Sequence, residues 1–234
     1  MLEISGLNVK LGRTEVLRDV TCSAAPGEVV AVIGPNGAGK TTLLHTIAGF
    51  IGRESYAGSI DVRGAAGAVL CPDSRLAFLD LTVPENLELV MLGLEWQREA
   101  RDAHREYLLS LVLQEDHRRR PVHALSSGVR RRLDIVLTIC KRASVYLFDE
   151  PFNGLDASWA RTFLRIVRCL SAAGRTCVIA SHAFDLLLPV SNSLWELNRG
   201  HLVRAFRQDE GGLDAAVIDY ADPTHDRTVE LPWL

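Results

Sequence analysis

The sequence has no long uninterrupted apolar run, no closely spaced cysteine pair and no excess of positive charge. A membrane-spanning helix needs about 18 consecutive apolar residues, and no stretch approaches that length, so we expect no membrane span. The first residues include Glu3 and lack a cationic start before an apolar run, which argues against a signal peptide. Because 26 Lys and Arg stand against 29 Asp and Glu, for a net charge of −3, we expect no nucleic-acid partner.

The five cysteines are scattered along the chain, and none belongs to a C-x-x-C pair. They are Cys22, Cys71, Cys140, Cys169 and Cys177. This spacing lacks the ligand pairs of a structural zinc site and predicts reduced thiols in a cytosolic protein. Hydrophobic residues at 47% and charged residues at 24% are typical of globular proteins, which excludes disorder, collagen and coiled coil for the bulk of the 234 residues.

Short β-like runs alternate with helical patterns over most of the chain. Residues 29–33 and 145–148 are continuous apolar runs, typical of strands covered on both faces of a parallel sheet. A further strand is predicted at 176–180, and a closing hairpin at 194–203. Helical spacing marks residues 40–50, 81–113, a stretch after Ser126, and 157–173. This order predicts an α/β fold with a parallel sheet and a helical subdomain.

Residues 34–41 fit the phosphate-loop pattern G-x-x-x-x-G-K-[ST] between a predicted strand and a predicted helix. Glycines let backbone amides converge on one anion, and the following helix directs its positive end to the same place. We expect Lys40 to contact the outer phosphates and the Thr41 hydroxyl to bind Mg²⁺. The predicted nucleotide-binding residues here are Gly34, Pro35, Asn36, Gly37, Ala38, Gly39, Lys40, Thr41 and Thr42.

Two acids follow the buried run 145–148, at the sheet edge where ligands bind in open α/β folds. Asp149 is expected to hold Mg²⁺, and Glu150 to orient or deprotonate an attacking water. His182 ends another strand at the same edge and is a candidate for sensing a γ-phosphate. The alternatives are two surface acids and a structural histidine.

The ordered set of motifs from residue 1 to about 203 resembles the ATP-binding cassette (ABC) ATPases. Besides the phosphate loop, the set comprises residues 71–73, 125–129, 149–150, 154–156 and His182. The resemblance implies a P-loop NTPase core with a mainly parallel sheet, an N-terminal antiparallel β portion and a helical signature subdomain. It implies one cassette over residues 1–204, with its core at 1–72 and 124–204, its helical subdomain at 73–123, and an extension of unknown role at 205–234.

The resemblance also implies ATP and Mg²⁺ as cofactors and Glu150 and His182 as catalytic residues. Two cassettes would meet head to tail and enclose two ATP molecules, so that Ser126 and the amide of Gly128 cap the γ-phosphate held by the partner. Asp156 would lie at that interface. Asp73 stands where the family usually has a Gln that contacts Mg²⁺, and it is our third candidate metal ligand after Thr41 and Asp149.

The sequence departs from the family pattern at several positions. Leu11 replaces the usual aromatic that stacks on adenine, and it can offer dispersion contact only. Ser127 and Val129 replace the usual glycine and glutamine of the signature, and the segment between residues 62 and 69 is short. The phosphate, metal and water positions are intact, so hydrolysis is still expected.

The function implied by the resemblance is an ATPase subunit that drives a transporter through a separate membrane permease. The chain would then lie on the cytoplasmic face of the membrane, with the permease docked in a groove beside the helical insert. Candidate groove residues are Phe78, Leu79, Leu89, Met91, Leu92 and Trp96. Core packing of the insert is the alternative for each of them, and Trp96, near a helix end, is the one most expected to be exposed.

Other functions remain open at this point. A soluble ABC ATPase acting on nucleic acid or ribosomes usually carries two cassettes or a long coiled coil between the motifs, and this chain has neither. A regulatory, weakly hydrolysing partner in an asymmetric pair agrees with the altered signature but not with Glu150 and His182. A P-loop kinase does not explain residues 125–128 and His182 together.

Overall fold

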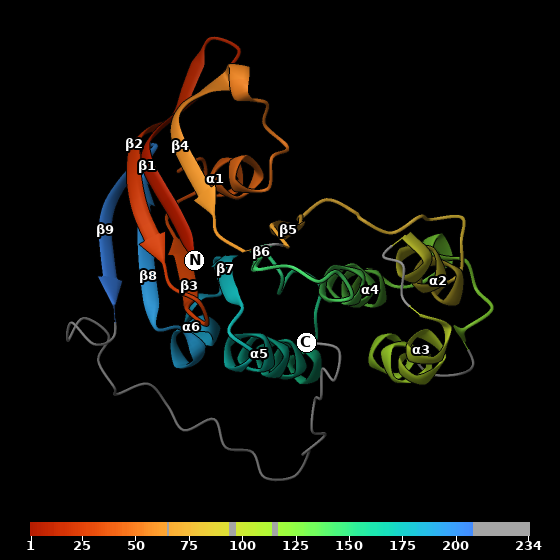
Figure 1. The fold of residues 1–234 in the computed structure, drawn as a ribbon. Helices are drawn as coiled ribbons and strands as arrows, with labels where there is room; N and C mark the ends of the chain where they lie inside the picture. Colours follow the sequence, from red (N-terminus) through yellow and green to blue (C-terminus); the bar gives the residue numbers. More distant parts are fainter. Residues whose placement is uncertain (65, 94–96, 114–116, 208–234) are drawn as a thin grey trace.

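The computed structural model describes residues 1–64, 66–93, 97–113 and 117–207, which form two β-sheets and the helices around them (Figure 1). The smaller sheet is antiparallel with strand order β2-β1-β4, and the larger has the order β5-β6-β7-β3-β8-β9. The strands are β1 (Leu2–Leu11), β2 (Thr14–Ala24), β3 (Val29–Ile33), β4 (Tyr56–Val62), β5 (Ala68–Cys71), β6 (Val145–Asp149), β7 (Thr176–Ala180), β8 (Ser193–Asn198) and β9 (His201–Arg207).

The larger sheet is parallel except for its last strand, because β9 turns back along β8. The predicted α/β fold, with a mainly parallel sheet and an N-terminal antiparallel portion, is therefore confirmed. The predicted hairpin is β8 and β9. It pairs Ser193 with Arg207, so the last strand continues beyond residue 204, where we expected the cassette to end. The expected extension lies outside the described residues from 208 onward.

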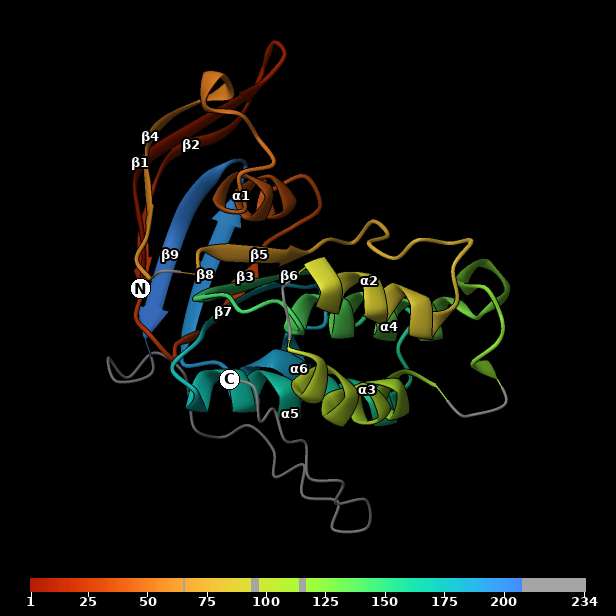
Figure 2. The same ribbon diagram turned by 45° about the vertical axis from the view of Figure 1, so that its right-hand side comes forward.

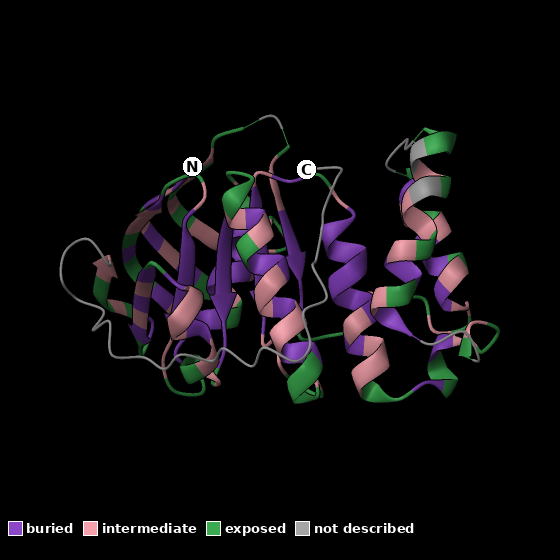
Figure 3. Cartoon of the chain, turned by 90° about the horizontal axis from the view of Figure 1, so that it is seen from below, coloured by how far each residue is buried: buried purple, intermediate pink, exposed green. Residues whose placement is uncertain are grey.

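Helices cover both faces of the larger sheet. They are α1 (Lys40–Ile47), α2 (Val83–Gly93), α3 (Arg98–Val112), α4 (Ser127–Ile139), α5 (Ala157–Ala172) and α6 (Phe184–Leu187), with 3₁₀ turns η1 (Arg53–Ser55), η3 (Val122–Ala124) and η4 (Leu188–Val190). Leu43 and Leu44 of α1 are buried in one apolar cluster with residues of both sheets, such as Leu7 and Val30. The other face packs α4 and α5 in a second cluster, and Figure 3 shows buried central strands behind a half-exposed α5.

Local sequence signals explain most helix ends. Helix α1 stops at Ile47 rather than near residue 50, because Gly49 has a φ of 77°. Gly174, with a φ of 74°, follows α5 where the sequence predicted its end. The helical pattern over 81–113 is divided into α2 and α3. A capping box begins α2, since Thr82 N–H donates to Glu85 at 2.7 Å and Glu85 N–H donates back to Thr82 Oγ1 at 3.4 Å.

Helices α2, α3 and α4 stand together to one side of the sheets (Figure 2). Among the described residues, none of the helices combines the length and apolar character that crossing a bilayer requires. The order of strands places the carboxyl ends of β6, β7 and β3 next to one another, because these strands are neighbours and parallel. The segments that follow them are residues 150–153, 181–183 and 34–40, and Asp149 is the last residue of β6, so all three predicted motifs converge on one edge.

Candidate active site

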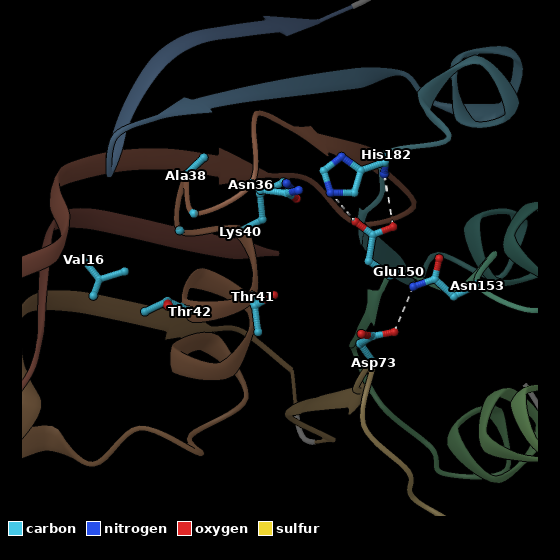
Figure 4. Close-up of a pocket in the computed structure, with 12 residues that line it drawn as sticks. Val16, Asn36, Ala38, Lys40, Thr41, Thr42, Asp73, Glu150, Asn153 and His182 are labelled. Carbon is cyan, nitrogen blue, oxygen red and sulfur yellow. Dashed lines mark hydrogen bonds and ion pairs between the residues drawn. The ribbon is translucent and has the colours of Figure 1, made fainter.

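A cavity of about 380 Å³ opens at this edge of the larger sheet (Figure 4). Its lining contains most of the predicted site residues together with two that the sequence did not suggest, Val16 and Asn153. The lining is Val16, Asn36, Gly37, Ala38, Gly39, Lys40, Thr41, Thr42, Asp73, Glu150, Asn153 and His182. Residues from β2, the phosphate loop and the ends of β5, β6 and β7 thus meet around one space.

The phosphate loop has a backbone that only glycine accommodates well. Gly34, Gly37 and Gly39 have φ values of 149°, 77° and 106°. A Cβ at Gly34 would lie 2.1 Å from the carbonyl oxygen of Leu197, so no other residue fits there. Lys40 Nζ donates to the Gly34 and Pro35 carbonyls at 2.8 and 3.3 Å, which holds the cation against the loop. Helix α1 begins directly after Gly39, so its positive N-terminal end faces the loop. Its first turn contains no acid that would offset this positive charge.

Asp149 has the environment expected of a metal ligand. Its side chain is 1% exposed, and neither carboxylate oxygen has a hydrogen-bond partner within the described part of the chain. Burial raises the pKa of Asp149, and the nearby Thr41 hydroxyl acts in the opposite direction. Two buried acceptor oxygens beside a hydroxyl suit Mg²⁺, a hard cation that prefers oxygen ligands. Asp149 and Thr41 therefore fit the Mg²⁺ expected beside a phosphate loop.

Asp73 lies on the same side of the cavity. Its Oδ1 accepts a hydrogen bond from Asn153 Nδ2 at 3.1 Å, which links the loop after β5 to the loop after β6. Its negative charge contributes to the raised pKa of Asp149, so the two carboxylates are electrostatically coupled. A cation between them would relieve this repulsion.

Glu150 and His182 are in direct contact, with 3.3 Å between His182 Nε2 and Glu150 Oε1. The other carboxylate oxygen accepts from Ser181 Oγ and from His182 N–H, both at 3.2 Å. Glu150 has a φ of 46°, an uncommon value for a residue with a side chain, and its N–H donates to Ala180 O at 2.8 Å. The backbone at the end of β6 is thus held against β7 in the conformation that aims Glu150 into the cavity. Our sequence reasoning missed Ser181, although it directly precedes His182.

The signature segment lies apart from this cavity. Ser126 is the N-cap of α4, where its hydroxyl accepts from Val129 N–H at 3.3 Å, and neither it nor Gly128 lines the cavity. A Cβ at Gly128 would lie 2.6 Å from the carbonyl oxygen of Gly154, so this position requires glycine. The structure therefore does not bring Ser126 and Gly128 to the chain's own phosphate loop.

The N-terminal ends of α4 and α5 are joined through Asp156. Its carboxylate pairs with Arg132 and also accepts from Trp159 N–H at 2.8 Å, which caps α5. The Trp159 N–H, followed by the charge of Arg132, lowers the pKa of Asp156 despite slight burial. The segment expected at a cassette interface is thus anchored to the signature helix.

Leu11, the position where the family resemblance places an aromatic, lies outside the cavity, and an aliphatic residue of the next strand lines the end of the cavity away from Glu150. Leu11 is 44% exposed at the end of β1 and does not belong to the lining. Val16, from β2, does, and Figure 4 shows it near Thr42 and far from His182. The place of Val16 in the lining could not be predicted from the sequence, where it belongs to an ordinary apolar run; it follows from the pairing of β1 with β2.

The family model described as "ABC transporter" matches residues 17–153, more than half of the chain. The chain belongs to this family. Its phosphate loop and its acids at the end of β6 lie inside the matched range, and the cassette is an ATPase.

Among curated relatives, a cobalt import ATP-binding protein of Rhodobacter capsulatus is 32% identical over 90% of this chain and 78% of its own length. An Fe(3+) ions import ATP-binding protein of Pseudomonas fluorescens is also 32% identical, over 87% of this chain, which spans only 60% of that relative. A solved structure of an ATP-binding subunit of an ABC transporter superposes with a TM-score of 0.82 at 25% identity, covering 93% of this chain and 95% of the other.

Proposed function

We propose that this chain is the ATP-hydrolysing subunit of a transporter and that it works with a separate membrane permease and a second cassette. The observation that carries the proposal is that Lys40, Glu150 and His182 line one cavity, with the buried carboxylate of Asp149 directly before Glu150 at the end of β6. Membership of the ABC transporter family supports ATP binding by this chain.

The residues of the cavity divide the reaction between them. The loop amides and Lys40 bind the phosphates of ATP. Thr41 and Asp73 of the lining, together with the buried Asp149, are the candidate ligands of Mg²⁺. When bound, Mg²⁺ neutralises charge on the phosphates during transfer. Glu150 accepts a proton from the attacking water, and His182 orients Glu150 and reaches toward the outer phosphate.

A second cassette would complete the site. Ser126 and Gly128, at the N-terminus of the 13-residue helix α4, offer a hydroxyl and a backbone amide but lie outside the chain's own cavity. In a head-to-tail pair they would contact the γ-phosphate held by the partner's phosphate loop. ATP would then close the pair, and hydrolysis would release it.

Apolar side chains beside the helical subdomain support docking of a permease. Phe78, Leu89 and Leu92 are exposed, whereas Met91 is buried, Leu79 packs partly against the core, and Trp96 lies outside the described residues. The buried side chain of Asn86 holds the backbone of Phe78 at both N–H and C=O, at 2.8 and 3.0 Å. The exposed position of the Phe78 ring is therefore determined by a rigid backbone.

The test is recovery of a partner from membranes. An affinity-tagged chain expressed in its native cells should retain a polypeptide with several membrane spans after detergent extraction, and the complex should hydrolyse ATP. Phe78→Asp should lose that polypeptide, and Val203→Asp, a control at an exposed apolar residue on β9, should keep it. Recovery of the chain without any membrane partner under all conditions would contradict the proposal.

A further inference from the structure

Arg131, in the first half of α4, binds three segments of the active site at once. Its side chain is only 6% exposed. The guanidinium donates to Pro72 O at 2.6 Å, to Asp149 O at 2.5 Å and, more weakly, to Pro151 O at 3.4 Å. The Pro72 carbonyl directly precedes Asp73, and the Asp149 carbonyl belongs to the candidate metal ligand itself. The Pro151 carbonyl directly follows Glu150.

Asp134, one turn farther along α4, holds the same loop at a second point. It is 4% exposed, and its Oδ1 accepts the N–H groups of Leu76 and Ala77 at 3.1 and 2.9 Å. Burial raises the pKa of Asp134, and these two N–H groups and then the charge of Arg131 counteract the rise. The loop that begins with Asp73 is therefore attached to α4 by a cation at one end and an anion at the other.

The phosphate loop is not part of this arrangement. Lys40 bonds to carbonyls of its own loop, between β3 and α1, and no hydrogen bond within the described chain joins Arg131 or Asp134 to residues 34–41. A change at the two α4 residues would thus displace Asp73, Asp149 and Glu150 and leave the phosphate loop in place. We therefore expect such a change to lower kcat and to leave the affinity for ATP nearly unchanged.

We propose that Arg131 and Asp134 act as a pair of positioning residues, through which α4 sets the placement of Asp73, Asp149 and Glu150 relative to the phosphate loop. The same helix begins at Ser126 and Gly128. On the proposed pairing of cassettes, on which this part of the inference rests, a contact of Gly128 with the partner's ATP moves α4. Arg131 then passes that movement to the backbone of Asp149, and one site reports its occupancy to the other.

The chemistry of arginine explains why this residue type is needed. A guanidinium presents five N–H donors in a planar fork and can bond to three carbonyls that lie around its plane. A lysine ammonium is a compact donor that cannot reach the same three carbonyls from one position. Arg131→Lys should therefore behave like loss of the bonds even though it keeps the charge.

The experiment separates turnover from nucleotide binding. Arg131→Met and Arg131→Lys should lower kcat by about 10- to 100-fold, the range expected when catalytic groups are displaced by roughly an ångström. The Kd for ATP, measured by calorimetry in EDTA so that the candidate Mg²⁺ ligands Asp73 and Asp149 do not contribute, should stay within about twofold because the phosphate loop is untouched. Asp134→Leu should resemble Arg131→Met, whereas Asp134→Asn keeps an acceptor oxygen for the Leu76 and Ala77 N–H groups and should retain most of the activity.

A matched control lies on the same helix. Thr138 is equally buried, and its hydroxyl donates within α4 to Asp134 O at 2.8 Å and interacts with the Cys71 thiol at the end of β5. Thr138→Val therefore perturbs the same region but removes none of the bonds that Arg131 and Asp134 make to the active-site loops. It should lower the melting temperature without lowering kcat. The double variant Arg131→Met/Asp134→Leu should lose no more activity than either single variant, because residues that act as a unit are not additive.

Three results would overturn the inference: Arg131→Lys with normal kcat, loss of ATP affinity in parallel with kcat, or an equal loss of kcat in Thr138→Val. If Arg131→Met does not fold, Arg131→Lys carries the same comparison with a smaller change in volume, and Asp134→Asn, which should stay active, is its control. The pairing of cassettes is checked separately with Glu150→Gln and ATP on a sizing column. Absence of a dimer there would count against the proposed function, and a dimer with unaltered kcat in the Arg131 variants would count against the positioning pair alone.

Discussion

Glu150 and His182, which follow the neighbouring strands β6 and β7, contact each other with 3.3 Å between the histidine Nε2 and the carboxylate Oε1. Ser181 donates to the other carboxylate oxygen, so the acid is held from two sides. This contact joins a proton acceptor to a ring that can hold it in place and suits the activation of water.

Replacement of Glu150 by Gln should lower kcat by about 10²- to 10⁴-fold, the contribution typical of a general base. The amide keeps the size of the side chain but cannot take a proton from water. ATP binding should persist, and ATP should hold two cassettes together because hydrolysis no longer separates them. Turnover by phosphate release and dimer formation by light scattering would check this, and near-normal turnover would show that another group takes the proton.

Replacement of Lys40 by Ala should weaken ATP binding by about 10- to 100-fold, since a hydrogen bond to a charged group contributes about 1.5–3 kcal/mol. The same change should remove measurable hydrolysis. Lys10→Ala, at an exposed position of β1, is the matched control and should bind ATP normally. Unchanged affinity in the Lys40 variant would mean that the loop does not bind the phosphates.

An aromatic residue introduced where it can stack on the adenine of ATP should tighten nucleotide binding by about 0.5–1.5 kcal/mol, the contribution of an aromatic stack. From the family pattern we expect the effect for Leu11→Tyr, whereas the cavity lining favours Val16→Tyr. Titration of both variants with ATP decides between the two positions. If neither variant gains affinity, the base is bound elsewhere.

Asp156→Ala should reduce the free energy of unfolding at pH 7 by about 1 kcal/mol, because the variant loses the N-cap of α5. The pKa of Asp156 is lowered in the folded state, so the unfolded state binds a proton more readily. The stabilisation is therefore complete above the ordinary carboxyl value of 3.8 and fades as the pH falls through the lowered value. Urea unfolding of both proteins from pH 7 downward should show the difference shrinking only in acid; a difference that grows there would contradict the capping role.

Much of the cassette could be predicted without coordinates because its signals are local. The β-branched run of β3 followed by closely spaced glycines and Lys40 specifies a strand, a loop and a helix in order, and Asp149–Glu150 after an apolar run marks the end of a buried strand. Parallel strands bring their carboxyl ends to one edge, so the gathering of these motifs was also expected. The contributions of Ser181, Asn153 and Val16 were not, because each depends on a contact between segments that are distant in sequence.

The arginines of α4 show the division most clearly. Arg130, Arg131 and Arg132 are alike in the sequence, and nothing in their spacing distinguishes one from another. A helix turns by about 100° per residue, so once α4 packs against β5 and α3 the three side chains point in different directions. Arg131 is buried on the carbonyls of Pro72 and Asp149, and Arg132 pairs with Asp156. Composition and spacing determined the strands, the phosphate loop and the acids, whereas the rotation of one packed helix decided which arginine reaches the active site.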